Sequence, residues 1–184
     1  MSRGKSRKEN QGGWKQEVWE WVKIILSAAV IAFVLNTFII ANSEVPSGSM
    51  EDTIMTGDRV IGSRLSYLFE EPQRGDIAIF HFPDNEKIYY VKRIIGLPGD
   101  TVDIVDGGVY LNGSKEPLEE PYIREPMIPE EAMHYEVPEG CYFMMGDNRN
   151  YSLDARRWQN TYVKKEKIIA KVMFRYYPKP GKIK

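Results

Sequence analysis

The sequence is poor in the residues that build disulfides and metal sites. Its 184 residues include one cysteine and two histidines. The single cysteine, Cys141, cannot close an intramolecular disulfide, and no cluster of cysteine and histidine has the spacing of zinc ligands. A disulfide scaffold and a zinc site are therefore not expected.

An excess of positive charge is also missing. The chain has 25 basic and 26 acidic residues, for a formal net charge of -1. A protein that binds nucleic acid through its overall charge needs a surplus of lysine and arginine, so no nucleic-acid partner is expected. The hydrophobic fraction of 42% and the charged fraction of 28% are those of a folded chain, which excludes a collagen-like or wholly disordered protein.

One long uncharged segment departs from this average composition. Eighteen residues from Ile24 to Ala41 carry no charge, and a membrane-spanning helix needs roughly 20 apolar residues. Lys23 can extend the span, because a lysine near the end of a helix can place its ammonium at the interface. Tryptophans favour the membrane–water boundary, and three precede the segment: Trp14, Trp19 and Trp21. We therefore predict a transmembrane helix over residues 22–41, with the lipid bilayer as its partner.

Two other interpretations of this segment compete with an anchor. The small residues around Ala41 and Ser43 would suit the cleavage site of a signal peptide, but the apolar run exceeds the ~7–15 residues of a signal-peptide core. A buried core helix is the second alternative, yet a helix that is apolar on all faces is rare in so small a domain. An uncleaved anchor is the better interpretation.

The charges on either side of the segment predict its orientation. Residues 1–23 contain six basic and three acidic residues, and the rest of the chain has more acidic than basic residues. Basic residues before the first span favour a cytoplasmic N-terminus. The expected organisation is a basic cytoplasmic segment (1–21), an anchor helix (22–41) and an extracytoplasmic β domain (42–184).

Beyond Asn42 the pattern is that of short strands. The expected strands are rich in Ile, Val, Tyr and Phe and are bounded by turn residues; they are 76–82, 87–95, 101–105, 108–111, 141–145 and 168–177. Asp106-Gly107 predicts a hairpin, because a type I′ turn needs positive φ angles. Residues 116–136, with four prolines and many acids, are predicted to be a loop-like insertion. The fold class is therefore mainly β: an N-terminal transmembrane helix followed by a small antiparallel β domain of barrel or sandwich type.

Residue chemistry alone leaves the function of this domain open. Ser47-Gly48-Ser49 would usually be a turn, and a serine hydroxyl is a weak nucleophile without a neighbouring base. His81 and His134 are poor candidates for that base, because one lies in an alternating strand and the other in the acidic loop. Lys92 lies in an apolar run, and burial can lower a lysine pKa by up to ~3–5 units. A lysine that faces solvent from its strand is, however, the more common case.

Three segments, taken together, resemble a known family. They occur in order after the span: 45–50 (VPSGSM), 90–100 (YVKRIIGLPGD) and 146–156 (GDNRNYSLDAR). They look like the sequence boxes of bacterial type I signal peptidases, which are membrane-bound serine–lysine proteases. Arg74-Gly75-Asp76 and the following Ile-Ala-Ile-Phe resemble a strand of that family, which makes a cell-adhesion motif the weaker interpretation. The short chain between the second and third boxes resembles the compact, single-span, Gram-positive type.

The resemblance implies roles for the residues in these boxes. Ser49 matches the family's nucleophile and Lys92 matches its general base. Ser47 matches the serine whose hydroxyl forms the oxyanion hole with the backbone N–H of Ser49.

Further residues match groups that support the site. Ser152 matches a serine that hydrogen-bonds and orients the lysine. Asp154 and Arg156 match a charged pair that supports the site, with Arg93 nearby. One departure is that Asp52 stands where many members have proline, which changes a turn but removes no catalytic group.

The resemblance implies a serine endopeptidase that removes N-terminal signal peptides from exported preproteins, after small residues at positions -3 and -1. Its expected partners are secretory preproteins, the bilayer and, by proximity, the export translocon, and no cofactor or metal is expected. Residues 42–184 would be the catalytic domain on the outer face of the plasma membrane. One rival is a membrane-anchored β module without catalysis. The other is a self-cleaving serine–lysine repressor, against which the apolar helix and the lack of a DNA-binding helix pair argue.

The charge asymmetry gives a testable orientation. In intact cells, an externally added protease should cleave the chain beyond Asn42 and spare residues 1–20, because the basic segment is retained in the cytoplasm. Immunoblots with epitope tags at either end measure this directly, with detergent-opened cells as the control. Protection of the C-terminal part and digestion of the N-terminal part would contradict the orientation.

Overall fold

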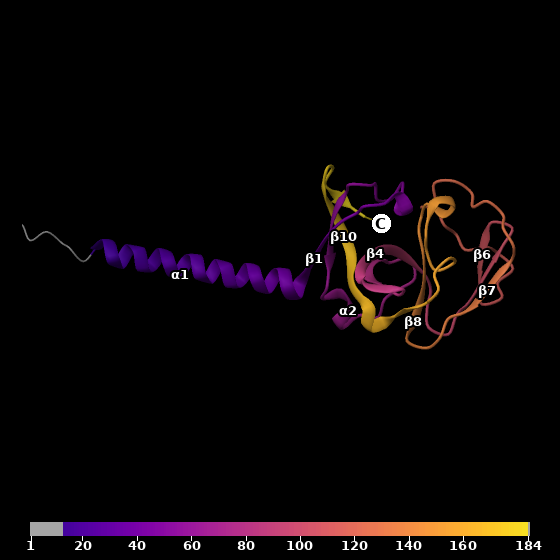
Figure 1. The fold of residues 1–184 in the computed structure, drawn as a ribbon, viewed down its shortest axis with the longest axis horizontal. Helices are drawn as coiled ribbons and strands as arrows, with labels where there is room; N and C mark the ends of the chain where they lie inside the picture. The colour runs from indigo at the N-terminus through magenta and orange to yellow at the C-terminus, as the bar shows by residue number, and fades with distance from the viewer. Residues whose placement is uncertain (1–12, 184) are drawn as a thin grey trace, which may run out of the picture. The chain divides into compact units, whose positions relative to one another are not determined.

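The computed structural model describes residues 13–183, so most of the predicted basic segment 1–21 lies outside the described residues. The chain divides into two units, Met1–Thr37 and Phe38–Lys184. The described residues of the first unit, from Gly13 onward, are helical, and the second unit is the β domain (Figure 1).

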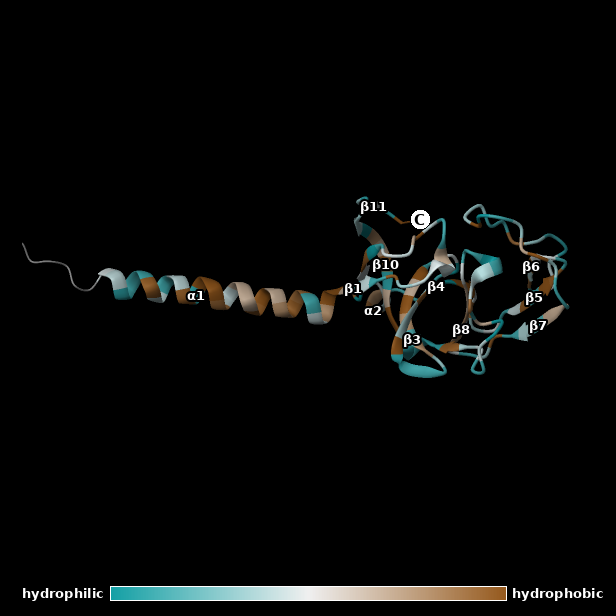
Figure 2. Cartoon of the chain, turned by 45° about the horizontal axis from the view of Figure 1, so that its top comes forward, coloured by the Kyte–Doolittle hydropathy of each residue, from teal (hydrophilic) through white to brown (hydrophobic). Residues whose placement is uncertain are grey.

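The helix α1 (Gly13–Val34) continues as a π-helical turn, Leu35–Ile39. None of its residues is buried, and apolar residues occur along its length (Figure 2). These 27 residues are long and apolar enough to cross a membrane. Helical geometry ends at Ile39, two residues before the expected boundary at Ala41.

Ala41 belongs instead to the edge strand β1 (Ile40–Glu44). It pairs with Gly62 and is buried in the β domain. Cleavage beside Ala41 would therefore divide a strand of the folded domain. This arrangement argues against the cleaved-signal-peptide interpretation.

The β domain contains two antiparallel sheets that are not closed barrels. The larger has the order β1-β2-β10-β3-β4-β8-β9, with β11 paired to β10, and the smaller has the order β6-β5-β7. Besides β1, the strands are β2 (Arg59–Ser63), β3 (Ile77–Phe82), β4 (Asn85–Gly96), β5 (Thr101–Val105), β6 (Gly108–Leu111), β7 (Met133–Glu136), β8 (Cys141–Met145), β9 (Val163–Lys164), β10 (Ile168–Tyr177) and β11 (Gly181–Lys182). One short helix, α2 (Ser66–Phe69), follows β2.

The expected strands correspond to β3, β4, β5, β6, β8 and β10. The predicted hairpin is confirmed, since Asp106 and Gly107 have φ angles of 48° and 77° and Val105 pairs with Gly108. The predicted loop 116–136 is wrong for its last four residues. They form β7 because they pair with β5, and because Tyr135 packs its ring on Phe143 of β8.

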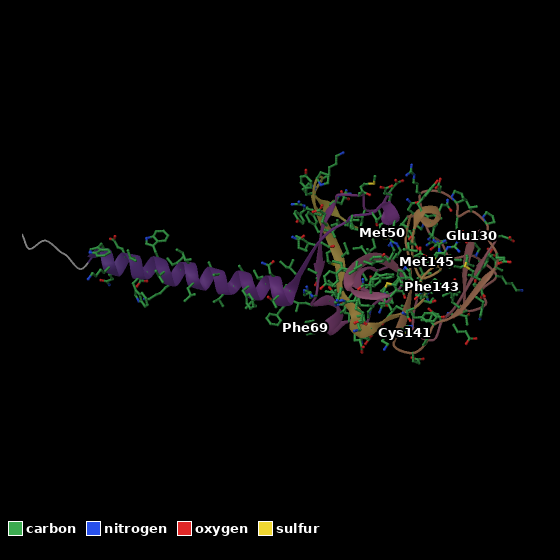
Figure 3. The ribbon with its side chains drawn as sticks, viewed as in Figure 1. Met50, Phe69, Glu130, Cys141, Phe143 and Met145 are labelled. Carbon is green, nitrogen blue, oxygen red and sulfur yellow. The ribbon has the colours of Figure 1, made fainter. Side chains whose placement is uncertain are left out.

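The core lies on both faces of the strands that carry the site. Successive residues of a strand point to opposite faces, so Ala78 and Phe80 of β3 pack in one buried cluster while Ile77 and Ile79 pack in another. The first cluster includes Phe143 and Met145, and the second includes Met50, from the turn after β1 (Figure 3). The β4 segment between these clusters is consequently shielded from water.

Candidate active site

The turn that carries Ser49 follows β1 and is fixed from two sides. Gly48–Met50 form one 3-10 turn, and the side chain of Met50 is completely buried. On the opposite side, Asn148 donates its backbone N–H to the Ser49 carbonyl (3.1 Å) and its side-chain amide to the Gly48 carbonyl (2.9 Å). The Ser49 side chain is thereby held in a defined position.

Lys92 reaches this turn from the middle of β4, where it pairs with Ala78 of β3. Its Nζ is hydrogen-bonded to Oγ of Ser49. The two residues are 3% and 7% exposed. Burial lowers the pKa of Lys92 to about 8, against the opposing effect of the Asp154 and Asp147 carboxylates. The two residues expected to react are therefore in contact, and the amine of Lys92 loses its proton more readily than that of an ordinary lysine.

Ser47 lies beside them. Its Oγ is 3.3 Å from Oγ of Ser49, and its backbone is extended. Both serines line a cleft with a volume of about 360 Å³. The other lining residues come from the end of β1, from β4 and from the turn after β8; they are Ser43, Glu44, Val45, Pro46, Ile88, Tyr89, Tyr90, Val91, Lys92, Tyr151 and Leu153.

The cleft offers strand edges on two sides. β1 is the outermost strand of its sheet. The β8 pairing of β4 covers only Arg93–Gly96, which leaves Ile88–Val91 outside this ladder. Exposed strand edges present unpaired N–H and C=O groups that can bind an extended chain.

The predicted charged pair is formed. Arg156 donates from Nε and Nη2 to the two carboxylate oxygens of Asp154, at 2.8 and 2.9 Å. Burial alone would raise the pKa of Asp154, but these hydrogen bonds and the N–H of Gly146 hold it below its usual value. The pair therefore fixes Gly146, which lies next to Ser49.

Arg93 makes a separate pair. Its Nε and Nη2 donate to Asp147 at 2.8 and 2.7 Å, and Thr53 donates to the same carboxylate at 2.5 Å. Sequence reasoning assigned no role to Asp147. A signal was available, because an arginine in an apolar strand needs a carboxylate and Asp147 lies in the third box.

The hydrogen bond expected between Ser152 and Lys92 is not formed. Oγ of Ser152 is buried and, within residues 13–183, has no partner at hydrogen-bonding geometry. It lies close enough to Asp154 to favour the carboxylate form of that residue. Ser152 thus lies beside Gly146 and is not hydrogen-bonded to the lysine.

Gly146 and Asn148 contact the turn that carries Ser49, and the sequence alone suggested no role for them. A Cβ on Gly146 would lie 2.4 Å from the Ser49 carbonyl oxygen and 2.2 Å from Oγ of Ser152. A side chain at this position would displace the turn that carries Ser49. The Gly-Asp-Asn run at the start of the third box was the only available signal.

A buried serine whose hydroxyl contacts a buried lysine amine, at the end of a cleft bordered by strand edges, is the arrangement of a serine hydrolase. The family model described as "Signal peptidase, peptidase S26" matches residues 18–177. The probable signal peptidase I-1 of Synechocystis is 37% identical over 172 residues, covering 87% of this chain and 85% of that protein. Signal peptidase I of Bacillus licheniformis is 36% identical over 173 residues, covering 89% and 91%. A crystal structure of a signal peptidase I from Enterococcus faecalis is similar with a TM-score of 0.48 and 33% identity, covering 55% of this chain and 97% of that one.

The chain belongs to the peptidase S26 family of signal peptidases: it is a type I signal peptidase and hence a hydrolase. Its reaction is the cleavage of signal peptides from preproteins, which are its substrates. The apolar helix makes it a membrane-anchored, single-pass protein.

The close approach of Gly146 to Ser49 gives a testable consequence. Gly146→Ala should lower kcat/KM for preprotein cleavage by about 100-fold, because a shift of about 1 Å at a reacting group can have such an effect. Gly181→Ala is the matched control, since no atom lies within 4 Å of a Cβ there. A folded Gly146→Ala enzyme with normal activity would show that the turn is not held by this contact.

Proposed function

We propose that Ser49 is the nucleophile and Lys92 the general base of a Ser/Lys dyad. One observation carries the proposal: the buried amine of Lys92 is hydrogen-bonded to the hydroxyl of Ser49. A serine hydroxyl needs a neighbouring base, and a neutral amine is a suitable one.

The pKa of Lys92 determines how often that base is available. With a pKa of about 8, about one amine in ten is neutral at pH 7, whereas fewer than about one in a thousand are neutral at the ordinary lysine pKa. Burial by the two core clusters thus makes the lysine a competent base near physiological pH. No metal ion or cofactor takes part in the proposed steps.

The proposed reaction has two steps, acylation of Ser49 and hydrolysis of the acyl-enzyme. Oγ of Ser49 bonds to the scissile carbonyl carbon while its proton passes to Nζ of Lys92, and Lys92 gives this proton to the leaving amine as the C–N bond breaks. Water next attacks the acyl-enzyme ester, giving one proton to Lys92, and the proton returns to Oγ as the serine is released. Lys92 is neutral at the start and at the end.

We assign the oxyanion hole to the hydroxyl of Ser47 and the backbone N–H of Ser49. Oγ of Ser47 is 3.3 Å from the nucleophilic oxygen, so it can donate to an oxygen that develops charge beside that atom. A preorganised donor at such a position is typically worth about 2.7–4 kcal/mol of transition-state stabilisation.

The charged groups around the dyad are proposed to support it. Asp154 with Arg156 fixes the Gly146 backbone, and Arg93 with Asp147 fixes the strand next to Lys92. Ser152 has a buried hydroxyl without a partner among residues 13–183. We propose that this hydroxyl accepts a hydrogen bond from Lys92 once the amine is protonated and leaves Ser49, which orients the lysine for the second proton transfer.

The substrate is proposed to bind as an extended strand along β1 and the free part of β4. Main-chain hydrogen bonds would supply affinity. Specificity for small residues at -3 and -1 would come from shallow apolar sites beside Val45 and Val91, since a close wall rejects larger side chains.

We further propose that residues 1–21 are cytoplasmic, that the anchor helix runs from residue 22 to Ile39, and that the β domain from Ile40 onward is extracytoplasmic and catalytic. The charge asymmetry supports this orientation. It would place the cleft where preproteins leave the export translocon.

The Lys92→Arg variant tests the dyad. Guanidinium stays protonated at any usable pH, so Lys92→Arg should be as inactive as Lys92→Ala and Ser49→Ala, with a loss of at least about 100-fold in kcat/KM. In the wild-type enzyme, kcat/KM should rise with pH and level off above about 8, as Lys92 loses its proton.

Lys87→Arg, at an exposed position of the same strand, is the matched control and should keep normal activity. Cleavage assays on a purified preprotein measure all four variants. Substantial activity of Lys92→Arg, with an unchanged pH profile, would mean that another group takes the serine proton.

A further inference from the structure

Residues 118–128, hereafter the covering segment, contact the second and third sequence boxes and the two residues that follow the first box. Arg124 lies 4.0 Å from Glu51 and 3.9 Å from Asp52, directly after the Ser49 turn.

The guanidinium of Arg93, next to Lys92, stacks on the ring of Tyr122 at 3.8 Å. Arg156 of the third box approaches the sulfur of Met127 at 3.1 Å. A segment that the sequence predicts to be a loop therefore joins parts of the site that are far apart in the chain.

Glu120 is the most buried charged group of the covering segment. Its carboxylate binds both Nη atoms of Arg149 and accepts the hydroxyl of Tyr122 at 2.7 Å. The side chains of Glu120 and Arg149 are 7% and 1% exposed, whereas Arg124 is 53% exposed. Water therefore screens the Arg124 contacts, but it does not screen the pair between Glu120 and Arg149.

Arg149 connects Glu120 to Gly146, which lies against the turn that carries Ser49. Its Nε donates to the Gly146 carbonyl at 3.0 Å. The N–H of Gly146 is held by Asp154 at 3.0 Å, so both ends of this backbone unit are fixed. Gly146 in turn lies against the Ser49 carbonyl.

We propose that Glu120 is a positioning residue for signal-peptide cleavage, which acts through Arg149 and Gly146 on Ser49. The role rests on the proposed function of Ser49 and Lys92. Without the carboxylate, Arg149 is a buried charge without its counter-ion. Its guanidinium then turns towards water and releases the Gly146 carbonyl, which leaves the Ser49 turn less well placed.

The expected effect is on kcat rather than on KM. The cleft is lined by residues 43–47, 49, 88–92, 151 and 153, and the hydrogen-bond partners of Glu120, Tyr122 and Arg149, are not among them. Loss of an interaction that orients the nucleophile lowers the rate of the bound complex and leaves substrate binding unchanged.

Glu120→Gln tests this role, with Glu119→Gln as the matched control. Both variants remove one negative charge from the same segment, but Glu119 is exposed. The full-length enzyme in detergent should lose about 10-fold in kcat per folded molecule in Glu120→Gln, with KM within about twofold of normal. Glu119→Gln should retain both values. Folding is measured for each protein by near-UV circular dichroism and Tm.

Arg149→Lys keeps the test decisive if Glu120→Gln folds poorly. It retains the positive charge but cannot donate in a fork to Glu120 while also donating to Gly146, so it should reproduce the loss in kcat.

Normal kcat in folded Glu120→Gln, a change confined to KM, or a loss explained by the unfolded fraction would each overturn the positioning role. Ser49→Ala is assayed alongside. Cleavage by Ser49→Ala would contradict the proposed function itself, whereas an inactive Ser49→Ala beside a fully active Glu120→Gln would reject the positioning role alone.

Discussion

The site depends on the burial of one amine against one hydroxyl. A protonated lysine is strongly disfavoured in apolar surroundings, and Lys92 meets this constraint by a lowered pKa. The sheet provides the surroundings, because the strand residues beside Lys92 pack in core clusters on both faces. The features that stabilise the β domain are therefore the same features that lower the pKa of Lys92.

The other buried charges near the dyad are arranged in pairs. Arg93 binds Asp147, Arg156 binds Asp154, and Arg149 binds Glu120. Each pair brings no net charge to the surroundings of Lys92, so desolvation remains the dominant influence on its pKa. Removing one partner of a buried pair typically costs about 3–5 kcal/mol. Because breaking any of these pairs is costly, the pairs hold the third sequence box in one position against β4 and the Ser49 turn.

Much of the fold could be predicted from local sequence. Strands such as β3 and β10 are rich in β-branched and aromatic residues, and the Asp106-Gly107 turn follows from its φ angles. The edge strand β1 was missed because its sequence, IANSE, has no apolar alternation and is stabilised by pairing with β2. The two-residue strands β9 and β11 are likewise defined only by their partners.

The candidate site, like the fold, could be predicted from the sequence only in part. Ser49 and Lys92 could be assigned because their boxes resemble those of a known family, and the structure brings the two side chains together. The partner of Arg149 could not be assigned, because Glu120 lies 29 positions away and outside the three boxes. The central claim is tested most directly by the pKa of Lys92 itself. NMR titration of the 13C-lysine-labelled enzyme, with the Lys92 signal assigned by its absence in Lys92→Ala, should give a lysine with a pKa of about 8. A Lys92 signal that titrates above about 10, like an ordinary exposed lysine, would contradict the account.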